Sequence, residues 1–352
     1  MNIIPQVAEA MQTVLTTTAD YAGRLTGFVK RERKLTGSGL VKTLVFGWLA
    51  KPSASLEELT QTAASLGISI SPQGLDYRFT KEASECLKQT LEVAVGNLIG
   101  ANPVAIPILQ RFNSVYLQDS SIVVLPDELA DIYQGCGGSR EKNTQSSVKL
   151  QVRWNMNTGG LDGPYLQAGK VNDRGSIIQE KPLPFGALRI ADLGYFSLKH
   201  LASLNTQGVY WLSLIFSQCI VIDQNEKTWD LVELLSAYCQ DKLDLEIFLG
   251  LKEHMPCRLI AIRVPEEVAK ERKRRIRADA TRRGKTPPKR RLELANWTIV
   301  VTSVPSQLLS WNEAFVLLTI RWQIELLFKL WKSHGYLDDW RSEKPFRILC
   351  EV

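Results

Sequence analysis

The spacing of apolar residues changes from a helical to a strand-like period near residue 114. From residue 1 to about residue 102 the apolar side chains follow a helical pattern. From Ser114 onward short apolar runs replace it, and residues 148–154 alternate apolar and polar side chains, which predicts a half-buried strand. This change places a helical region ahead of a sheet-forming region.

The sheet-forming region predicts strands mixed with helices. Three strands come first, and then a buried strand, a short helix and another strand follow in turn. This order is typical of a mixed sheet with helices packed against it, so we predict an α/β (α+β) fold. The first strand signals are the apolar residues 115–117 and 122–125, which flank Asp119. Further strands are expected at residues 148–154, 164–168, 187–191 and 209–215, and a helix is expected at residues 197–204.

Composition excludes several classes of protein. The longest apolar stretch, residues 208–222, is too short for a membrane helix, which needs about 20 residues. The first 15 residues lack the basic start and apolar core of a secretory signal, so we expect a cytoplasmic protein without a membrane partner. The six cysteines form no C-x-x-C pair, and the three histidines stand far apart. Any metal should therefore be held by carboxylates, which favour Mg²⁺ or Mn²⁺.

Positive charge is concentrated in one strip, residues 270–291. It contains twelve Lys and Arg against two acids, whereas the whole chain has a net charge of only +6. Such a strip is suited to a phosphate backbone, and the alternative is a solvated loop that has no partner. The candidate DNA-binding residues in the strip are Arg274, Arg275, Arg282, Arg283 and Arg290.

Residues 55–80 resemble a helix-turn-helix. A first helix should stop at Gly67, and a second should begin at Ser71, a good capping residue, with Pro72 in its first turn. In this interpretation Gln73, Asp76, Tyr77 and Arg78 point toward a DNA groove, and Arg78 is the candidate DNA-binding residue. The alternative is an ordinary helical hairpin in a bundle.

Two aspartates follow apolar runs at points where strands are expected to end. Asp119 follows the first strand and Asp192 the buried strand at 187–191. Taken alone, each could serve as a turn or cap residue.

A third acid lies in an apolar helix that should begin at Ser310, with Glu313 completing a capping box, and continue past residue 331. Arg321, Glu325 and Lys332 share one narrow stripe of this helix. Because its other directions are apolar, we expect the helix to be largely buried, and a buried Glu325 requires a cation. The alternative is a surface ion pair between Arg321 and Glu325.

The segment Arg321-Trp322-Gln323-Ile324-Glu325, with Lys329 and Lys332 beyond it, resembles the Y-x2-R-x3-E-x6-K signature of DDE transposases of bacterial insertion sequences, of the IS-four type. Asp119 and Asp192 resemble the two aspartates of this family. Leu318 occupies the place of the signature tyrosine, and the chain stops at Val352, where family members usually continue. We therefore expect a C-terminally truncated member.

The resemblance implies a ribonuclease-H-like catalytic core that is interrupted by an insertion. The expected domains are a helical DNA-binding domain at 1–105, the first part of the core at 106–216, a strand-rich insertion with the basic strip at 217–309, and the C-terminal helical part of the core at 310–352.

The resemblance also implies two-metal phosphoryl transfer in cut-and-paste transposition. Asp119, Asp192 and Glu325 would hold two Mg²⁺ ions, for which Mn²⁺ can substitute. Arg321, Lys329 and Lys332 would contact DNA phosphates. The expected partners are transposon ends and target DNA, bound by a homodimer.

Three alternatives remain open for the function. The first is an impaired, truncated transposase that acts only as a DNA-binding or regulatory relic. The second is a ribonuclease-H-like nuclease that cleaves DNA but does not join it. The third is a helical transcription factor that uses residues 55–80, and this one leaves the stripe from Arg321 to Lys332 unexplained.

Overall fold

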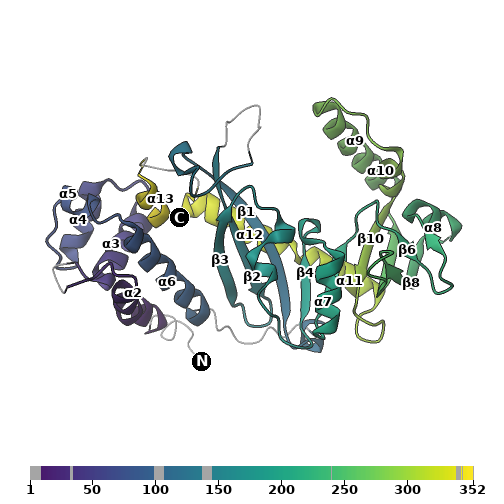
Figure 1. The fold of residues 1–352 in the computed structure, drawn as a ribbon, viewed down its shortest axis with the longest axis horizontal. Coiled ribbons are helices and arrows are strands. Elements are labelled where there is room, and N and C mark those ends of the chain that lie inside the picture. The colour runs from purple at the N-terminus through teal and green to yellow at the C-terminus, as the bar shows by residue number, and fades with distance from the viewer. Residues whose placement is uncertain are drawn as a thin grey trace. The chain divides into compact units, whose positions relative to one another are not determined.

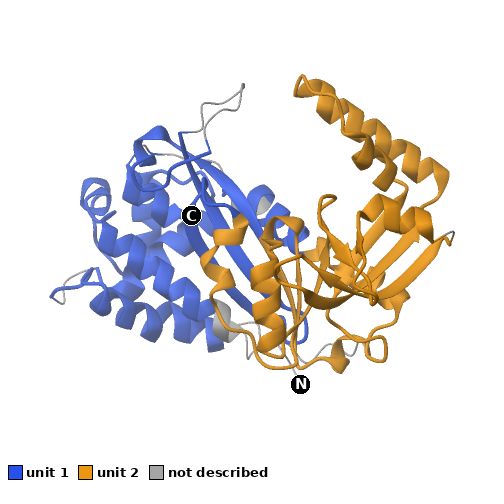
Figure 2. Cartoon of the chain, turned by 45° about the vertical axis from the view of Figure 1, so that its right-hand side comes forward, with its two compact units in different colours: residues 1–103, 120–172, 324–352 blue, residues 104–119, 173–323 orange. Residues whose placement is uncertain are grey.

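The computed structural model describes residues 9–31, 35–98, 107–136, 145–238, 240–337, 342 and 344–351. The chain divides into two compact units (Figure 2). Unit 1 comprises Met1–Pro103, Ser120–Asn172 and Ile324–Val352, and unit 2 comprises Val104–Asp119 and Asp173–Gln323. These units group the chain differently from the four predicted segments, whose independence as domains stays a prediction.

Unit 1 contains a group of helices and a β-hairpin (Figure 1). Its helices are η1 (Val14–Thr18), α2 (Ala19–Leu25), α3 (Gly37–Ala50), α4 (Leu56–Ser65), α5 (Pro72–Asp76), α6 (Lys81–Leu98), most of α12 (Trp322–Gly335) and α13 (Pro345–Glu351). Its strands are β2 (Ser146–Asn155), β3 (Leu161–Ala168) and the second part of β1 (Val115–Leu125), in the order β3-β2-β1. The helices share a core, and α6 packs against both β3 and α13.

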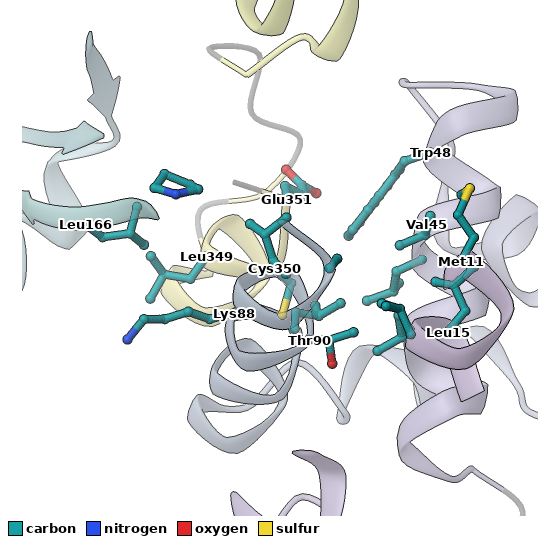
Figure 3. A pocket seen from close by; sticks show the side chains of 17 residues that line it. Met11, Leu15, Val45, Trp48, Lys88, Thr90, Leu166, Leu349, Cys350 and Glu351 are labelled. Carbon is teal, nitrogen blue, oxygen red and sulfur yellow. The ribbon is translucent and has the colours of Figure 1, made fainter. Parts of the chain in front are cut away.

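An apolar cavity of about 360 Å³ lies among the helices of unit 1, next to β3 (Figure 3). Leu15, Val45 and Trp48 line it from the N-terminal helices, and Leu349 lines it from α13. Cys350 of α13 is buried in the shared core of these helices. The segment at 345–351 is therefore part of the core of the helical group.

Strand β2 corrects one prediction. Its alternating pattern predicts one exposed face, but its first eight residues are all buried, including Lys149 and Arg153. Lys149 donates a hydrogen bond from Nζ to the carbonyl oxygen of Val171 at 2.7 Å, and Arg153 pairs with Asp162 at 2.9 Å. These partners let the polar face be buried, because they satisfy the charged groups inside the protein.

Unit 2 is built on a long mixed sheet (Figure 1). Its strands are the first part of β1, β4 (Leu188–Ala191), β5 (Tyr210–Leu214), β6 (Val221–Ile222), β7 (Thr228–Trp229), β8 (Lys242–Leu249), β9 (Met255–Arg263) and β10 (Trp297–Thr302). Their order is β1-β4-β5-β10-β9-β8-β6-β7. Strands β1, β4 and β5 are parallel, while β10 is antiparallel to both β5 and β9. Its helices are α7 (Leu198–Thr206), α8 (Leu231–Ala237), α9 (Glu266–Arg282), α10 (Lys289–Leu294) and α11 (Trp311–Ile320).

The strands of the predicted insertion continue the same sheet, because β10 pairs directly with β5. One apolar core joins the two parts, with Trp211 of β5 and Leu259 of β9 both fully buried in it. The sheet and its helices confirm the predicted mixed α/β class and agree with a ribonuclease-H-like core. Within the described residues, no helix is both long enough and apolar enough to span a bilayer.

Candidate functional site

The register of two parallel strands brings the two aspartates to adjacent positions. Gln118 of β1 is paired with Ala191 of β4, and the next residue along each strand is Asp119 and Asp192, respectively. The prediction that both lie at strand ends is half right. Asp192 directly follows β4, but Asp119 lies in the middle of β1, which continues to Leu125. The two acids are neighbours because the parallel register of β1 and β4 places position 119 beside position 192.

One guanidinium contacts both aspartates. The Nη1 atom of Arg321 is 3.3 Å from Oδ2 of Asp119 and 3.7 Å from Oδ1 of Asp192. The side chains of Arg321 and Asp119 are 21% and 15% exposed, so this contact is largely shielded from water, whereas Asp192 is 42% exposed. The Oδ2 atom of Asp192 accepts a hydrogen bond from the backbone nitrogen of Gly194 at 3.3 Å. One oxygen of Asp192 therefore caps the following turn, while the other faces the arginine.

The predicted continuous helix is divided into two at Arg321. Helix α11 ends at Ile320 and α12 begins at Trp322, and Arg321 forms the turn between them. The prediction of a largely buried helix is also wrong, since Val316 and Trp322 are more than half exposed. The high apolar content of the segment therefore overestimates its burial. The predicted capping box of Ser310 and Glu313 is confirmed.

A buried polar network supports the strand pair beside the aspartates. Arg189 of β4 is 2% exposed and donates from Nε to Oε1 of Gln118 at 3.0 Å. It also donates from Nη2 to Oε1 of Gln179 at 2.7 Å, and its guanidinium lies 5.8 Å from the ring centre of Tyr195. Arg189 is not among the site residues that the sequence predicts. The signal was an arginine inside an apolar strand, which requires polar partners when it is buried.

The aspartate pair has the donor chemistry for a divalent cation. Carboxylate oxygens are the ligands that hard cations prefer, and Arg321 already places a positive charge against one oxygen of each aspartate. Arg321 brings one positive charge to these two carboxylates. The aspartates therefore fit a cation site in charge and in ligand type.

The third predicted ligand, Glu325, stands in the first turn of α12. It belongs to unit 1, whereas both aspartates belong to unit 2. Across the described ranges, no three His, Cys, Asp or Glu side chains are grouped so that they could hold a metal ion. The triad of Asp119, Asp192 and Glu325 thus stays a prediction.

The two lysines of the predicted stripe differ in their surroundings. Lys332 donates from Nζ to the carbonyl oxygen of Ile122 at 2.7 Å, which ties α12 to β1 within unit 1. The side chain of Lys329, one helical turn earlier, is exposed. Their contact with DNA phosphates stays a prediction.

The basic strip forms a helical hairpin rather than a loop. Helices α9 and α10 connect the antiparallel strands β9 and β10, and in Figure 2 this hairpin extends away from the strands of unit 2. Arg272 anchors α9 by donating to the carbonyl oxygen of Trp297 at 2.9 Å and to Oγ1 of Thr298 at 3.0 Å. Arg290 anchors α10 through an ion pair with Asp230.

The predicted DNA-binding arginines of α9 and its C-terminal end are exposed and surround two acids. Glu271 pairs with Arg274 and Arg275. The hydrogen bond from Arg274 has the largest effect and that from Arg275 the next largest, and together they hold the pKa of Glu271 at about 2. Asp279 pairs in the same way with Arg282 and Arg283, which lower its pKa. The hairpin therefore keeps a large excess of positive charge.

The predicted helix pair in residues 55–80 is confirmed. Ser71 caps α5, and Pro72 lies in its first turn. Helix α5 is only five residues long, so Tyr77 and Arg78 follow it rather than belong to it. The side chain of Asp76 was expected to face DNA, but its carboxylate forms an ion pair with Lys344. The reading of DNA by this segment stays a prediction.

Comparisons with known proteins agree with this geometry. The Transposase DDE domain family matches residues 110–352. The chain is 29% identical over 350 residues to the transposase for insertion sequence element IS231B of Bacillus thuringiensis subsp. berliner, covering 93% of this chain and 72% of that protein.

Two further relatives cover the chain to a similar extent. The transposase for insertion sequence element IS231E of Bacillus thuringiensis subsp. finitimus is 29% identical over 347 residues, with 92% of this chain and 72% of that protein covered. The transposase for insertion sequence element IS1151 of Clostridium perfringens is 26% identical over 351 residues, again with 92% and 72% covered. The match to the family model over residues 110–352, which includes both aspartates and Arg321, shows that this chain belongs to the family of transposases with a DDE domain.

Proposed function

We propose that this chain catalyses metal-dependent cut-and-paste transposition, in which it cleaves DNA at the ends of an insertion sequence and joins these ends to target DNA. The main support is the adjacent placement of Asp119 and Asp192 on one guanidinium, in a chain of the DDE transposase family. Transposases for insertion sequence elements are also the relatives that match over most of the chain.

We assign Asp119, Asp192 and Glu325 as the ligands of Mg²⁺, for which Mn²⁺ can substitute, with two ions bound in the complete site. A bound divalent cation would make water or a DNA 3′-hydroxyl a stronger nucleophile and would stabilise the leaving oxygen. The aspartates supply negative charge that Arg321 alone does not neutralise. Glu325 is the third carboxylate of the family signature, at the start of the helix that follows Arg321.

Arg321 has two tasks in this proposal. Without metal it neutralises part of the charge of Asp119 and Asp192. In the complete site its guanidinium would contact a DNA phosphate, which an arginine can hold with two parallel hydrogen bonds. Lys329 and Lys332 would provide further phosphate contacts as point charges. Leu318, in place of the signature tyrosine, has no hydroxyl to donate to a phosphate.

DNA is the proposed partner, and the α9–α10 hairpin is the proposed surface for its backbone. The exposed arginines 274, 275, 282 and 283 outnumber the two acids among them, and phosphates are the complementary charge. An insertion sequence has two ends, and cutting both in one complex requires two copies of the catalytic site. We therefore propose a homodimer on DNA.

A second candidate is a regulator that binds element ends without cutting them. Two observations favour it. Leu318 cannot make the hydrogen bond of a tyrosine, and Arg321 occupies the position between the aspartates. In this case the chain would bind DNA and compete with active transposase.

The test is a cleavage and strand-transfer assay with the full chain and DNA that carries the inverted repeats of its element. We expect products with Mg²⁺ or Mn²⁺ and none with EDTA. Asp119→Asn keeps the size of the side chain but removes its charge. Changes in the shell around metal ligands cost about 10- to 100-fold, so losing a ligand should reduce the rate by more than about 100-fold.

The matched control is Asp127→Asn, which neutralises an exposed acid elsewhere in the chain. It should cleave at the unsubstituted rate. Equal rates for Asp119→Asn and the unsubstituted chain would refute the assignment of Asp119. DNA binding without any cleavage, in both Mg²⁺ and Mn²⁺, would favour the regulator.

A further inference from the structure

A second cationic surface belongs to unit 1, whereas Asp119, Asp192 and the basic hairpin belong to unit 2. A cleft of about 350 Å³ is formed by the segment after α2 and by the turn between α5 and α6. Its walls carry three basic side chains, Lys30, Arg31 and Arg78, and the side chain of Tyr77. Glu82 is the one acid among the described residues that line it.

Two buried phenylalanines fix the positions of these cations. Phe28 and Phe79 are each 8% exposed and belong to the core of the helical group. Phe28 stands two residues before Lys30, and Phe79 directly follows Arg78. Phe79 is held in addition by the guanidinium of Arg347, 5.4 Å from its ring centre. The cations are thus attached to anchored backbone, which lowers the entropic cost of binding a ligand.

Glu82, the one acid among the described residues of the lining, is held mainly by its own helix terminus. The pKa of Glu82 is lowered first by a hydrogen bond from its own backbone nitrogen and then by the hydroxyl of Thr80, with smaller effects of the charges of Lys30 and Lys81. Glu82 therefore interacts mainly with the N-terminus of α6. Among the described residues, no carboxylate forms a salt bridge with Lys30, Arg31 or Arg78, so the cleft keeps an excess of positive charge.

The exposure of Tyr77 indicates an extended ligand. Its side chain is 83% exposed at the mouth of the cleft, which is unusual for a large aromatic residue. An aromatic ring beside several cations is suited to a nucleic acid strand, because the cations meet phosphates and the ring meets a sugar or a base. A small anion would not make use of the ring.

We propose that this cleft binds the sugar-phosphate backbone of DNA through Lys30, Arg31 and Arg78, with Tyr77 packed against the adjacent nucleotide. The proposal rests on the proposed function, since it assumes that DNA is the partner. It differs from the helix-turn-helix prediction, because the contact is made by the residues after α5 and by the segment after α2. A recognition helix in a groove is not required.

The experiment measures DNA binding by the full chain in EDTA, where cleavage cannot interfere. Fluorescence anisotropy with a labelled duplex gives the affinity at several salt concentrations. The test variant is Lys30→Gln/Arg31→Gln/Arg78→Gln. Each phosphate contact contributes about 0.9 to the slope of log affinity against log salt, so the slope should fall by between about 2 and 3, and the affinity by about tenfold or more at 0.1 M salt.

The matched control is Lys51→Gln/Lys88→Gln/Lys170→Gln, which removes the same charge from the same unit but outside the cleft. It should leave the slope nearly unchanged. Circular dichroism checks that both variants fold, and if the triple variant does not, Arg78→Gln and Arg78→Lys replace it. A slope that the cleft variant leaves unchanged would overturn the proposal.

Two further readouts separate this proposal from the proposed function. Tyr77→Ala should weaken binding by about fivefold or more, and Tyr77→Phe should have little effect, since a base-stacking contact is worth about 1–3 kcal/mol. If the cleft variant loses slope but the unsubstituted chain cuts no DNA, the cleft stands and the catalytic proposal fails. If the unsubstituted chain cuts DNA but the cleft variant keeps its salt slope, the catalytic proposal stands and the cleft proposal fails.

Discussion

The aspartate site and the basic hairpin pair acids with arginines in opposite proportions. At the site, two carboxylates share the single guanidinium of Arg321, and the contact is partly buried. On the hairpin, each acid is shared by two arginines that are at least 66% exposed. Acids therefore outnumber arginines in the contacts of Arg321 with the two aspartates, and arginines outnumber acids in the pairs on the hairpin.

This difference supports a separate proposed partner for each region. A cation bound at the aspartates gains from low exposure, since charges interact more strongly where water is scarce. The hairpin arginines are surrounded by water, so their pairs with Glu271 and Asp279 are weak and can open for a phosphate. Charge balance together with exposure, rather than the count of arginines, distinguishes the two.

The largest effect in this comparison concerns the hairpin. Lys273, Arg277, Lys285 and Arg291 have no salt bridge to a carboxylate in the described part of the chain, so they are the cations most available to DNA. Replacing all four by Gln should lower the affinity for duplex DNA of arbitrary sequence by about tenfold or more and reduce the salt slope by about 3 to 4. Anisotropy titrations in EDTA measure both.

A control for this variant uses four exposed lysines elsewhere in unit 2, Lys181, Lys199, Lys227 and Lys252, changed to Gln. It alters the net charge equally and should have a much smaller effect. The assignment of the hairpin fails if the two variants lose the same affinity.

A smaller effect is expected at the aspartates. Arg321→Gln removes the cation that competes for Asp119 and Asp192, so Mn²⁺ should bind more tightly in the absence of DNA. An ion pair of this exposure is worth up to about 1 kcal/mol, which corresponds to about fivefold in affinity. Electron paramagnetic resonance of free Mn²⁺ measures the change without any catalysis.

Arg321→Lys is the control for this change, because it keeps the charge next to the aspartates. Its Mn²⁺ affinity should stay near that of the unsubstituted chain. Weaker binding by Arg321→Gln would mean that the guanidinium supports the metal site instead of competing with it.

The sequence was sufficient to predict features that depend on local residues. Ser71 and Ser310 cap helices as expected, and Asp192 follows a buried strand. These features depend on a few neighbouring positions, where side-chain chemistry determines the backbone. The pairing of β2 with β3 was predictable for the same reason, since a short turn joins the two strands.

The features that the sequence analysis got wrong or could not see depend on distant residues. The alternating pattern of β2 gives no sign that Lys149 and Arg153 find partners in the interior. The contact of Arg321 with Asp119 joins residues that are 202 positions apart, and a local sequence pattern does not show which distant residues meet. Two of the three predicted acids, Asp119 and Asp192, lie side by side. Their adjacency depends on the pairing of β1 with β4, and the sequence does not show which strands are neighbours.

The smallest effect concerns the helix that leads to Arg321. At the start of α11, Glu313 accepts hydrogen bonds from the backbone nitrogen of Ser310 at 3.0 Å and from both terminal nitrogens of Arg111, at 2.9 and 2.7 Å. Arg111, and after it the contacts with Ser310, hold the pKa of Glu313 at about 2. Glu313→Gln should therefore destabilise the fold by about 1 kcal/mol at pH 7, as the loss of a helix cap does.

The pH dependence of this loss distinguishes a charge effect from a packing effect. Because the pKa of Glu313 is lower in the folded chain than its ordinary value near 4.5, its contribution is complete above pH 4.5 and disappears as the pH falls toward 2. Thermal melts at pH 7 and pH 3 should therefore show a smaller difference between Glu313→Gln and the unsubstituted chain at pH 3. Glu233→Gln, at an exposed acid in the first turn of α8, should show little difference at either pH. If the difference in melting temperature between Glu313→Gln and the unsubstituted chain were equal at both pH values, Arg111 and Ser310 would not stabilise α11 through the charge of Glu313.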